Sequence, residues 1–474
     1  MPTLRIRLTH VGLVVGIAIM TVALACGQSS GVSPTGEVSS EQSVFQESDQ
    51  EMADRLIGSG VRFQELGDFQ NAIKVLDRVL RLDSSNALAY YHRGNANGGL
   101  GNLEGAIADY GAAIRFNLEL VDVYLRRGVS HSRLRRFTEA IEDLDQFIAG
   151  SEPDATAYRA RGLAYYGLSE WERAIKDFDQ AIAVDPGLAV VFNDRALSLV
   201  NVGRHTEAIE DFGRAVKLSP DEAMFYDNRG GTWQAMGNYV WAIEDYDRAL
   251  LADPSYAPSY ENRGNAYRRF NDYSRAIADY DEAIRLTPWS ASTYFNRGMA
   301  YGLMDEWESA VRDYGFAISR YPLYAEAYYN RAGALSNLGD FDAAILDLDT
   351  VIGLQPTWAE PYHERARTKL KLGDTEGALD DLSRAIDLAP QFAAAYLNRG
   401  MAAYGVGDFE QAAEDYTKVL QMQPEALEAY EKRARAYTML GLEEEAKADV
   451  ATLAQMGFDV GALEAELADL WTHR

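Results

Sequence analysis

The sequence predicts an all-α protein built as an elongated stack of helical hairpins, and three observations predict it. A unit of 34 residues recurs twelve times between Ala53 and Val460 without insertion or deletion. Small residues recur at positions 8 and 20 of this unit, where two helices can pack closely. A turn-forming residue at position 15 and a proline at position 32 mark the helix ends. Such a chain is a solenoid of helix-turn-helix units.

Residues 1–25 differ from the rest of the chain and predict a signal peptide. Arg5 and Arg7 precede the apolar run LVVGIAIMTVALA, which ends at Cys26. A basic start, a short apolar core and small residues before a cleavage site are typical of exported proteins. The segment ALAC resembles the lipobox of bacterial lipoproteins, although Ala23 stands where that family prefers Leu. The resemblance implies that Cys26 is acylated, and two or more acyl chains anchor a protein stably.

The signal predicts a protein exported to the periplasmic or extracytoplasmic face of a bacterial envelope membrane and held there by the lipid. An uncleaved membrane anchor and an ordinary secretory signal are the alternatives. Residues 26–52 then form the anchor cysteine and a flexible linker, because the stretch is rich in Ser, Gly, Gln and Glu. Cys26 is the only cysteine of the chain, so neither disulfides nor thiol catalysis are expected after acylation.

Residues 53–460 hold the twelve units, which start at residue 53 and every 34 residues thereafter. Position 20 is Ala in every unit, and position 8 is Gly or Ala in every unit. Between the two apolar stretches of a unit, position 15 is usually Gly, which permits the left-handed backbone that ends a helix. Asn271 and Asp305 are the next-best residues there, whereas Arg135 and Ser169 fit less well. Residues 461–474 add a closing helix, whose Leu463, Leu467, Leu470 and Trp471 form one apolar stripe.

The period, the small residues, the aromatic residues at positions 4, 11 and 24, and the terminal Pro resemble the tetratricopeptide repeat. The resemblance covers residues 53–460. It implies a right-handed superhelix with a concave groove that the first helices of the units line.

Two columns of opposite charge run through the units. Position 7 is Arg and position 23 is Asp in units two to twelve, while unit one has Ser59 and Val75 instead. Because both partners are missing together, we expect each Arg to pair with the Asp of its own unit. This ladder is predicted to be structural, since the Asp column neutralises the Arg column.

A column of asparagines at position 6 is the candidate binding site. An Asn amide can satisfy a peptide N–H and C=O together, and neighbouring first helices about 10 Å apart match about three residues of extended chain. The column is similar to the asparagine ladder of the O-linked N-acetylglucosamine transferases, so it predicts an extended peptide held by its backbone. The alternative is that Asn-Arg-Gly is simply a common sequence in this repeat and that the asparagines are solvated. The members are Asn228, Asn262, Asn296, Asn330 and Asn398, with Glu364 interrupting them.

Other first-helix positions add mixed groove candidates. The chaperone-binding subgroup of the family uses a basic clamp. Asn265 matches one position of that clamp, but Glu261 stands where the clamp has a lysine, which disfavours chaperone binding. The further candidates are Phe295, Met299, Tyr329 and Tyr404, which are apolar or aromatic, and Arg268, Arg269, Arg367 and Lys371, which are basic.

The composition excludes several function classes. The formal charge of −27 disfavours nucleic-acid binding, because an acidic surface repels phosphates. No phosphate loop, nucleophile elbow or zinc motif is present in the sequence, so we expect neither an enzyme nor a cofactor. The predicted function is a non-catalytic scaffold that binds protein segments or extended peptides at the envelope. A structural subunit of a pilus, secretion or outer-membrane machine, and a regulator of a cell-wall enzyme, are the alternatives; the oligomeric state is left open.

Overall fold

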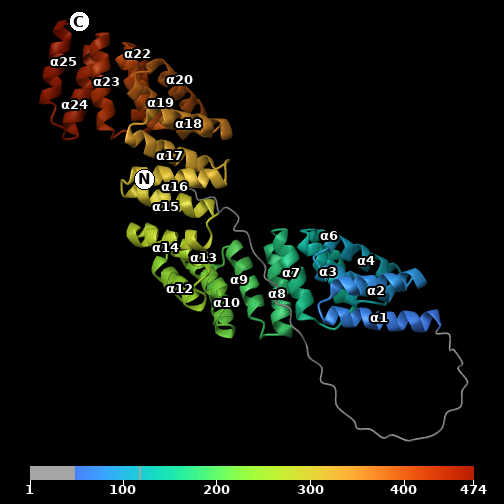
Figure 1. The fold of residues 1–474 in the computed structure, drawn as a ribbon. Helices are drawn as coiled ribbons and strands as arrows, with labels where there is room; N and C mark the ends of the chain where they lie inside the picture. Colours follow the sequence, from blue (N-terminus) through green and yellow to red (C-terminus); the bar gives the residue numbers. More distant parts are fainter. Residues whose placement is uncertain (1–47, 117–118, 474) are drawn as a thin grey trace, which may run out of the picture.

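The computed structural model describes residues 48–116 and 119–473, and within them it forms 25 helices and no strand. The helices follow one another in chain order from α1 at one end of an elongated, curved stack to α25 at the other (Figure 1). This arrangement confirms the predicted all-α solenoid. The predicted signal peptide, Cys26 and residues 26–47 of the linker lie outside the described residues.

Each unit contributes one inner helix and one outer helix, which are the first and second helices of its hairpin. The inner helices are α1 (Asp49–Glu65), α3 (Ala87–Gly99), α5 (Asp122–Arg133), α7 (Ala155–Gly167), α9 (Ala189–Asn201), α11 (Ala223–Ala235), α13 (Ala257–Arg269), α15 (Ala291–Leu303), α17 (Ala325–Leu338), α19 (Ala359–Leu372), α21 (Ala393–Gly405) and α23 (Leu427–Leu440). The outer helices are α2 (Phe69–Leu82), α4 (Leu103–Phe116), α6 (Phe137–Gly150), α8 (Trp171–Val184), α10 (His205–Leu218), α12 (Tyr239–Ala252), α14 (Tyr273–Leu286), α16 (Trp307–Arg320), α18 (Phe341–Leu354), α20 (Thr375–Leu388), α22 (Phe409–Met422) and α24 (Glu443–Gln455).

The first helix begins earlier than the sequence predicts. Residues 49–52, expected to belong to the linker, form the first turn of α1. The cause is a capping box, in which the Ser48 hydroxyl accepts a hydrogen bond from the Glu51 N–H while the Glu51 carboxylate accepts one from the Ser48 N–H. These two bonds satisfy amide groups that a helix start otherwise leaves unpaired.

Position 15 carries a positive φ in every unit, so the inner helices end as predicted. The glycines at this position have φ between 74° and 85°. Arg135, Ser169, Asn271 and Asp305 adopt the same conformation, with φ between 59° and 62°. The register of the hairpin therefore imposes the left-handed turn even on Arg135 and Ser169, whose side chains disfavour it.

The helices form two layers along the curved stack (Figure 1). Inner helices of successive units contact each other. For example, α11 contacts α13, and α17 contacts α19. In the described part of the chain, outer helices make comparable contacts only with the inner helices of their own and the next unit. The inner helices are therefore the more closely spaced layer, and they line the concave side of the stack.

Helix α25 (Gly461–His473) covers the last hairpin. Its Leu463 and Leu467 are buried against Ala434, Val450 and Leu453 of α23 and α24. Arg435 of α23 also donates from Nε and Nη2 to the Glu466 carboxylate of α25, at 2.8 and 2.9 Å. The final repeat thus has its apolar face shielded from water.

Across the described ranges, none of the helices combines the length and the apolar character needed to cross a membrane.

Candidate functional site

The Arg–Asp ladder confirms the predicted pairing within each unit. In units two to twelve the Arg at position 7 donates from Nε and Nη2 to the two carboxylate oxygens of the Asp at position 23, at 2.5–2.9 Å. Two parallel bonds of this kind are among the strongest side-chain interactions. The ladder ties each inner helix to its outer helix and leaves no carboxylate of this column free for a ligand.

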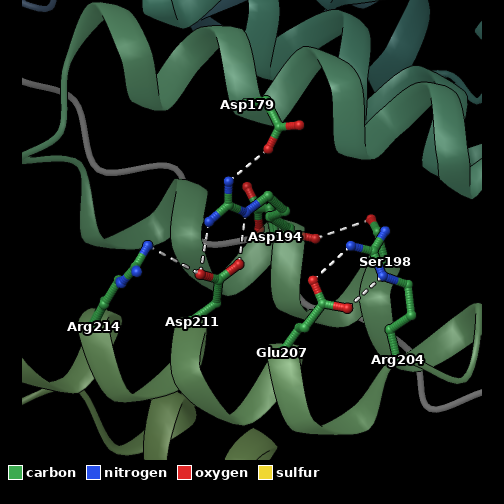
Figure 2. A network of polar contacts seen from close by, with 8 residues as sticks. Asp179, Asp194, Ser198, Arg204, Glu207, Asp211 and Arg214 are labelled. Carbon is green, nitrogen blue, oxygen red and sulfur yellow. Dashed lines mark hydrogen bonds and ion pairs between the residues drawn. The ribbon is translucent and has the colours of Figure 1, made fainter.

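Six of these arginines also reach back to a carboxylate of the preceding unit, a contact that the repeat columns do not predict. Arg195 bonds to Asp211 of its own unit at 2.6 Å and, through Nη1, to Asp179 of the preceding unit at 2.6 Å. Figure 2 shows Asp179 and Asp211 on opposite sides of one guanidinium group. The carboxylate that the arginine reaches occupies position 25. The contacts of this type involve Asp77, Asp145, Asp179, Asp247, Asp281 and Asp349.

The asparagine column lies half-buried along the inner helices, where it also links neighbouring units. Asn228 Nδ2 donates to Asn193 Oδ1 at 2.8 Å, and Asn262 Nδ2 donates to the Asp227 carboxylate at 3.1 Å. Asn296 donates in the same way to Glu261, at 3.1 Å. The acceptor always stands at position 5 of the preceding unit, 35 residues earlier. One N–H of each of these asparagines is therefore used inside the protein.

Asn398 and Asn330 complete the column in different ways. Asn398 Nδ2 lies 2.7 Å from His363 Nε2, again position 5 of the preceding unit. For Asn330 that position is Phe295, which has no acceptor, so its amide instead donates to the Glu326 carbonyl of its own helix at 2.7 Å. Within the described residues the Oδ1 atoms of all five asparagines accept no hydrogen bond. They remain able to bind a peptide N–H, and the binding role stays a prediction.

Asp227 is a buried carboxylate of this face whose pKa is strongly shifted. Its carboxylate accepts hydrogen bonds from the Ser259 hydroxyl at 2.8 Å and from Asn262, and no cation contacts it within the described chain. Burial raises the pKa of Asp227 to about 6, although the bonds from Ser259 and Asn262 oppose this change. The carboxylate is thus held by neutral donors, whereas the carboxylates of the Arg–Asp ladder are held by arginine.

A cavity of about 390 Å³ opens among the inner helices α13, α15, α17 and α19. Its walls include Asn330 of the column and Arg268, Met299 and Tyr329, which are groove candidates from the sequence. Glu364, which interrupts the column, lies on the wall that α19 provides. The structure therefore brings together residues from four units that the sequence pattern treats as separate columns.

The described residues hold no cluster of His, Cys, Asp and Glu arranged to bind a metal ion. The lateral acceptors at position 5 were missed because their residue type varies from Asn to Asp, Glu and His. A comparison of positions 35 apart would have found them, since an acceptor precedes every asparagine of the column except Asn330.

The two-layered stack of helical hairpins with a concave inner face defines the class of the protein as a helical-repeat scaffold. Models of the tetratricopeptide repeat match most of it. The matched residues are 60–101 and 264–305, 87–119, 125–189, 193–257, 295–357, 363–405 and 393–426. The chain belongs to the tetratricopeptide repeat family, whose fold is typical of protein–protein interaction.

No curated protein matches the chain. Among solved structures, YrrB, described as a TPR protein with an unusual peptide-binding site, is 24% identical over 40% of this chain and 96% of its own, with a TM-score of 0.36. Yeast Tom70 is 17% identical over 85% of this chain and 96% of its own, with a TM-score of 0.37. The Cut9–Hcn1 hetero-tetramer of the APC/C is 16% identical over 82% of this chain and 84% of its own, with a TM-score of 0.41.

Proposed function

We propose that this protein is a non-catalytic scaffold that binds extended protein segments along its concave face. The observation that carries the proposal is the continuous layer of inner helices, on which five half-buried asparagines each keep an unused Oδ1 acceptor. An extended segment can donate its backbone N–H groups to these atoms without regard to its side chains. The cavity beside Asn330 then receives one side chain of the segment.

Asn330 offers the cleanest test, because its removal breaks no bond between units. With the full-length chain purified in detergent, we expect Asn330→Ala to weaken binding of unstructured peptides by about 1 kcal/mol, the usual value of one hydrogen bond. The melting temperature should stay unchanged. Asn262→Ala is the matched comparison, since it removes a donor to buried Asp227 and should also lower stability.

Calorimetry of peptide binding beside thermal unfolding distinguishes these cases. Combining Asn262→Ala, Asn296→Ala and Asn330→Ala should weaken peptides of different sequence by similar factors, because backbone groups are recognised. If affinity is unchanged in both the single and the triple variant, the asparagine column serves packing alone, and another part of the concave face must bind any ligand.

We further propose that the chain is exported and anchored by a lipid on Cys26. The basic start, the apolar run and the ALAC segment support this proposal. Cys26→Ser should leave a larger, unprocessed form that carries no acyl chain, and intact-mass measurement on the membrane fraction checks both properties. A mature protein that begins at Met1, or an unmodified Cys26, would rule out the lipid anchor.

A further inference from the structure

The cavity among α13, α15, α17 and α19 is shaped by missing side chains. Gly302 and Gly333 stand on two of its walls, and a Cβ added at Gly333 would meet no atom within 4 Å. The volume of about 390 Å³ exceeds what one amino-acid side chain needs and lies at the low end of small-ligand pockets. The cavity can therefore take a side chain of a bound segment together with part of its backbone.

Arg268 supplies the cavity with a positive charge, and no carboxylate of the described residues forms an ion pair with it. In the same part of the chain its Nε is buried without a hydrogen-bond partner. The Tyr280 phenol is a neighbour of this guanidinium: burial raises the pKa of Tyr280 to about 12, and Arg268 opposes that increase through its charge and through a side-chain hydrogen bond to the phenol. An unpaired donor out of water is costly, so an acceptor placed here would be bound favourably.

The one carboxylate on the cavity wall does not serve as that acceptor. Glu364 bonds to Arg367 Nη1 at 3.0 and 2.9 Å and lies 3.3 Å from His363 Nδ1. Burial alone would raise the pKa of Glu364, but these two partners outweigh it and leave the pKa lowered. The charge of Glu364 is thus already balanced within α19, and the free charge of the cavity is that of Arg268.

We propose that this cavity binds a carboxylate of the segment held along the concave face, and that Arg268 donates to it. The carboxylate comes from an Asp or Glu side chain or from the end of a chain. Its oxygens bond to the guanidinium while its stem packs against Met299 and Leu303. The proposal rests on the proposed function of the groove. It adds selectivity, because the remaining surface of a chain with charge −27 repels anionic segments.

Peptide pools of defined composition test the proposal while the natural partner is still unidentified. Ten-residue pools of Ser, Ala, Gly and Thr, capped at both ends, carry one fixed central residue, which is Glu, Gln or Lys. A fourth pool has Gln at the centre and a free C-terminal carboxylate. With the full-length protein, the Glu pool should bind about tenfold more tightly than the capped Gln pool, as expected for a charge-assisted pair of hydrogen bonds. A gain in the fourth pool instead would place the carboxylate at the chain end.

Variants then assign the preference to Arg268. Arg268→Gln should remove the preference for the carboxylate pool over the capped Gln pool. Arg268→Glu should produce a preference for the Lys pool instead. Arg269→Gln is the matched control, because this adjacent arginine is exposed and does not line the cavity, and it should leave the preference intact. Melting temperatures check folding, and Arg268→Lys, which keeps the charge, should retain part of the preference.

The outcomes separate this inference from the proposed function. Equal binding of the Glu, Gln and free-carboxylate pools by the unaltered protein would overturn the carboxylate site and leave backbone recognition standing. A preference that survives Arg268→Gln would overturn the role of Arg268. If none of the pools binds, both proposals fall.

Discussion

The buried carboxyl of Asp227 makes stability depend on pH. Its folded pKa of about 6 lies above the ordinary value of 3.8, because burial disfavours the charged form. The folded protein therefore holds this proton more tightly than the unfolded chain does. The contribution of this proton to the free energy of unfolding is fully present below pH 4 and is lost as the pH rises through 6. Ionisation at neutral pH then costs the folded state up to about 3 kcal/mol, since one pKa unit corresponds to about 1.4 kcal/mol.

We expect Asp227→Asn to stabilise the protein at pH 7.5 and to change little at pH 4. The amide oxygen of Asn can still accept hydrogen bonds from Ser259 and Asn262, but it carries no charge to bury. Thermal unfolding between pH 4 and 8 measures the effect, with the exposed Asp221→Asn as the control for the loss of one charge. A parallel pH dependence in the variant and the natural protein would contradict the assignment.

Arg297 illustrates how unequal the two bonds of a ladder arginine are. Its partner Asp313 has a side chain 3% exposed, whereas its second partner, Asp281 of the preceding unit, is 54% exposed. Arg297→Leu should cost about 3 kcal/mol, because it strands a buried carboxylate. Asp281→Ala should cost at most about 1 kcal/mol, as for other exposed pairs. Urea unfolding compares them, and Arg297→Leu with Asp313→Leu should recover much of the loss; additive losses would mean that the two side chains do not interact.

Within a hairpin, the residue at position 24 determines which small residue position 8 can hold. Tyrosines at position 24 always face Gly, as Tyr314 faces Gly298, whereas the alanines at position 8 face Leu, Phe or Val. A Cβ added to Gly298 would lie 2.8 Å from the Tyr314 ring. Inner and outer helices are therefore fitted to each other pair by pair.

We expect Gly298→Ala to destabilise the protein by about 1–3 kcal/mol, the usual cost of overpacking. Adding Tyr314→Leu should make the alanine tolerable, because other units combine Ala with Leu, as Ala332 does with Leu348. Gly333→Ala is the control, since its Cβ has open space and helix propensity alone should stabilise by about 0.5–1 kcal/mol. Chemical unfolding of these variants checks the fit; equal effects of the two alanines would refute it.

At the scale of the whole stack, α25 should decide how well the last repeat holds together. Leu463→Ser and Leu467→Ser should each cost about 2 kcal/mol or more, because both side chains are buried against α23 and α24. The exposed Ala462→Ser and Ala465→Ser are matched controls on the same helix. Hydrogen exchange should show faster exchange in α24 for the leucine variants, before any effect reaches distant repeats. Uniformly faster exchange along the chain would contradict such local behaviour.

Features repeated within one unit were predictable from the columns of the repeat, whereas contacts between units do not show in any one column. The Arg–Asp pairs and the turn at position 15 recur in every unit or nearly every unit. The same residue type therefore recurs at the same repeat position, and this recurrence predicts both features. The partner of Asn262 at Asp227 and that of Arg297 at Asp281 depend on how two units pack laterally, which no single unit encodes. Asn330 shows the same limit, since the absence of an acceptor at Phe295 has meaning only once the lateral contact between positions 35 apart is known. The start of α1 was missed because its capping box lies before the first unit.

The bonds to position 25 are not present at every joint between units, and we expect this to make the resistance of the stack to stretching uneven. Position 25 is glycine instead of aspartate at Gly111, Gly213 and Gly315, which recur every third unit. At these three joints the arginine of the next unit has no position-25 side chain to which it can donate a hydrogen bond. We expect these joints to be weaker than their neighbours, which would divide the stack into stiffer segments of about three repeats. Under a pulling force applied between the two ends of the stack, we expect it to lengthen first at these joints. Tension then reshapes the concave face before any single repeat unravels.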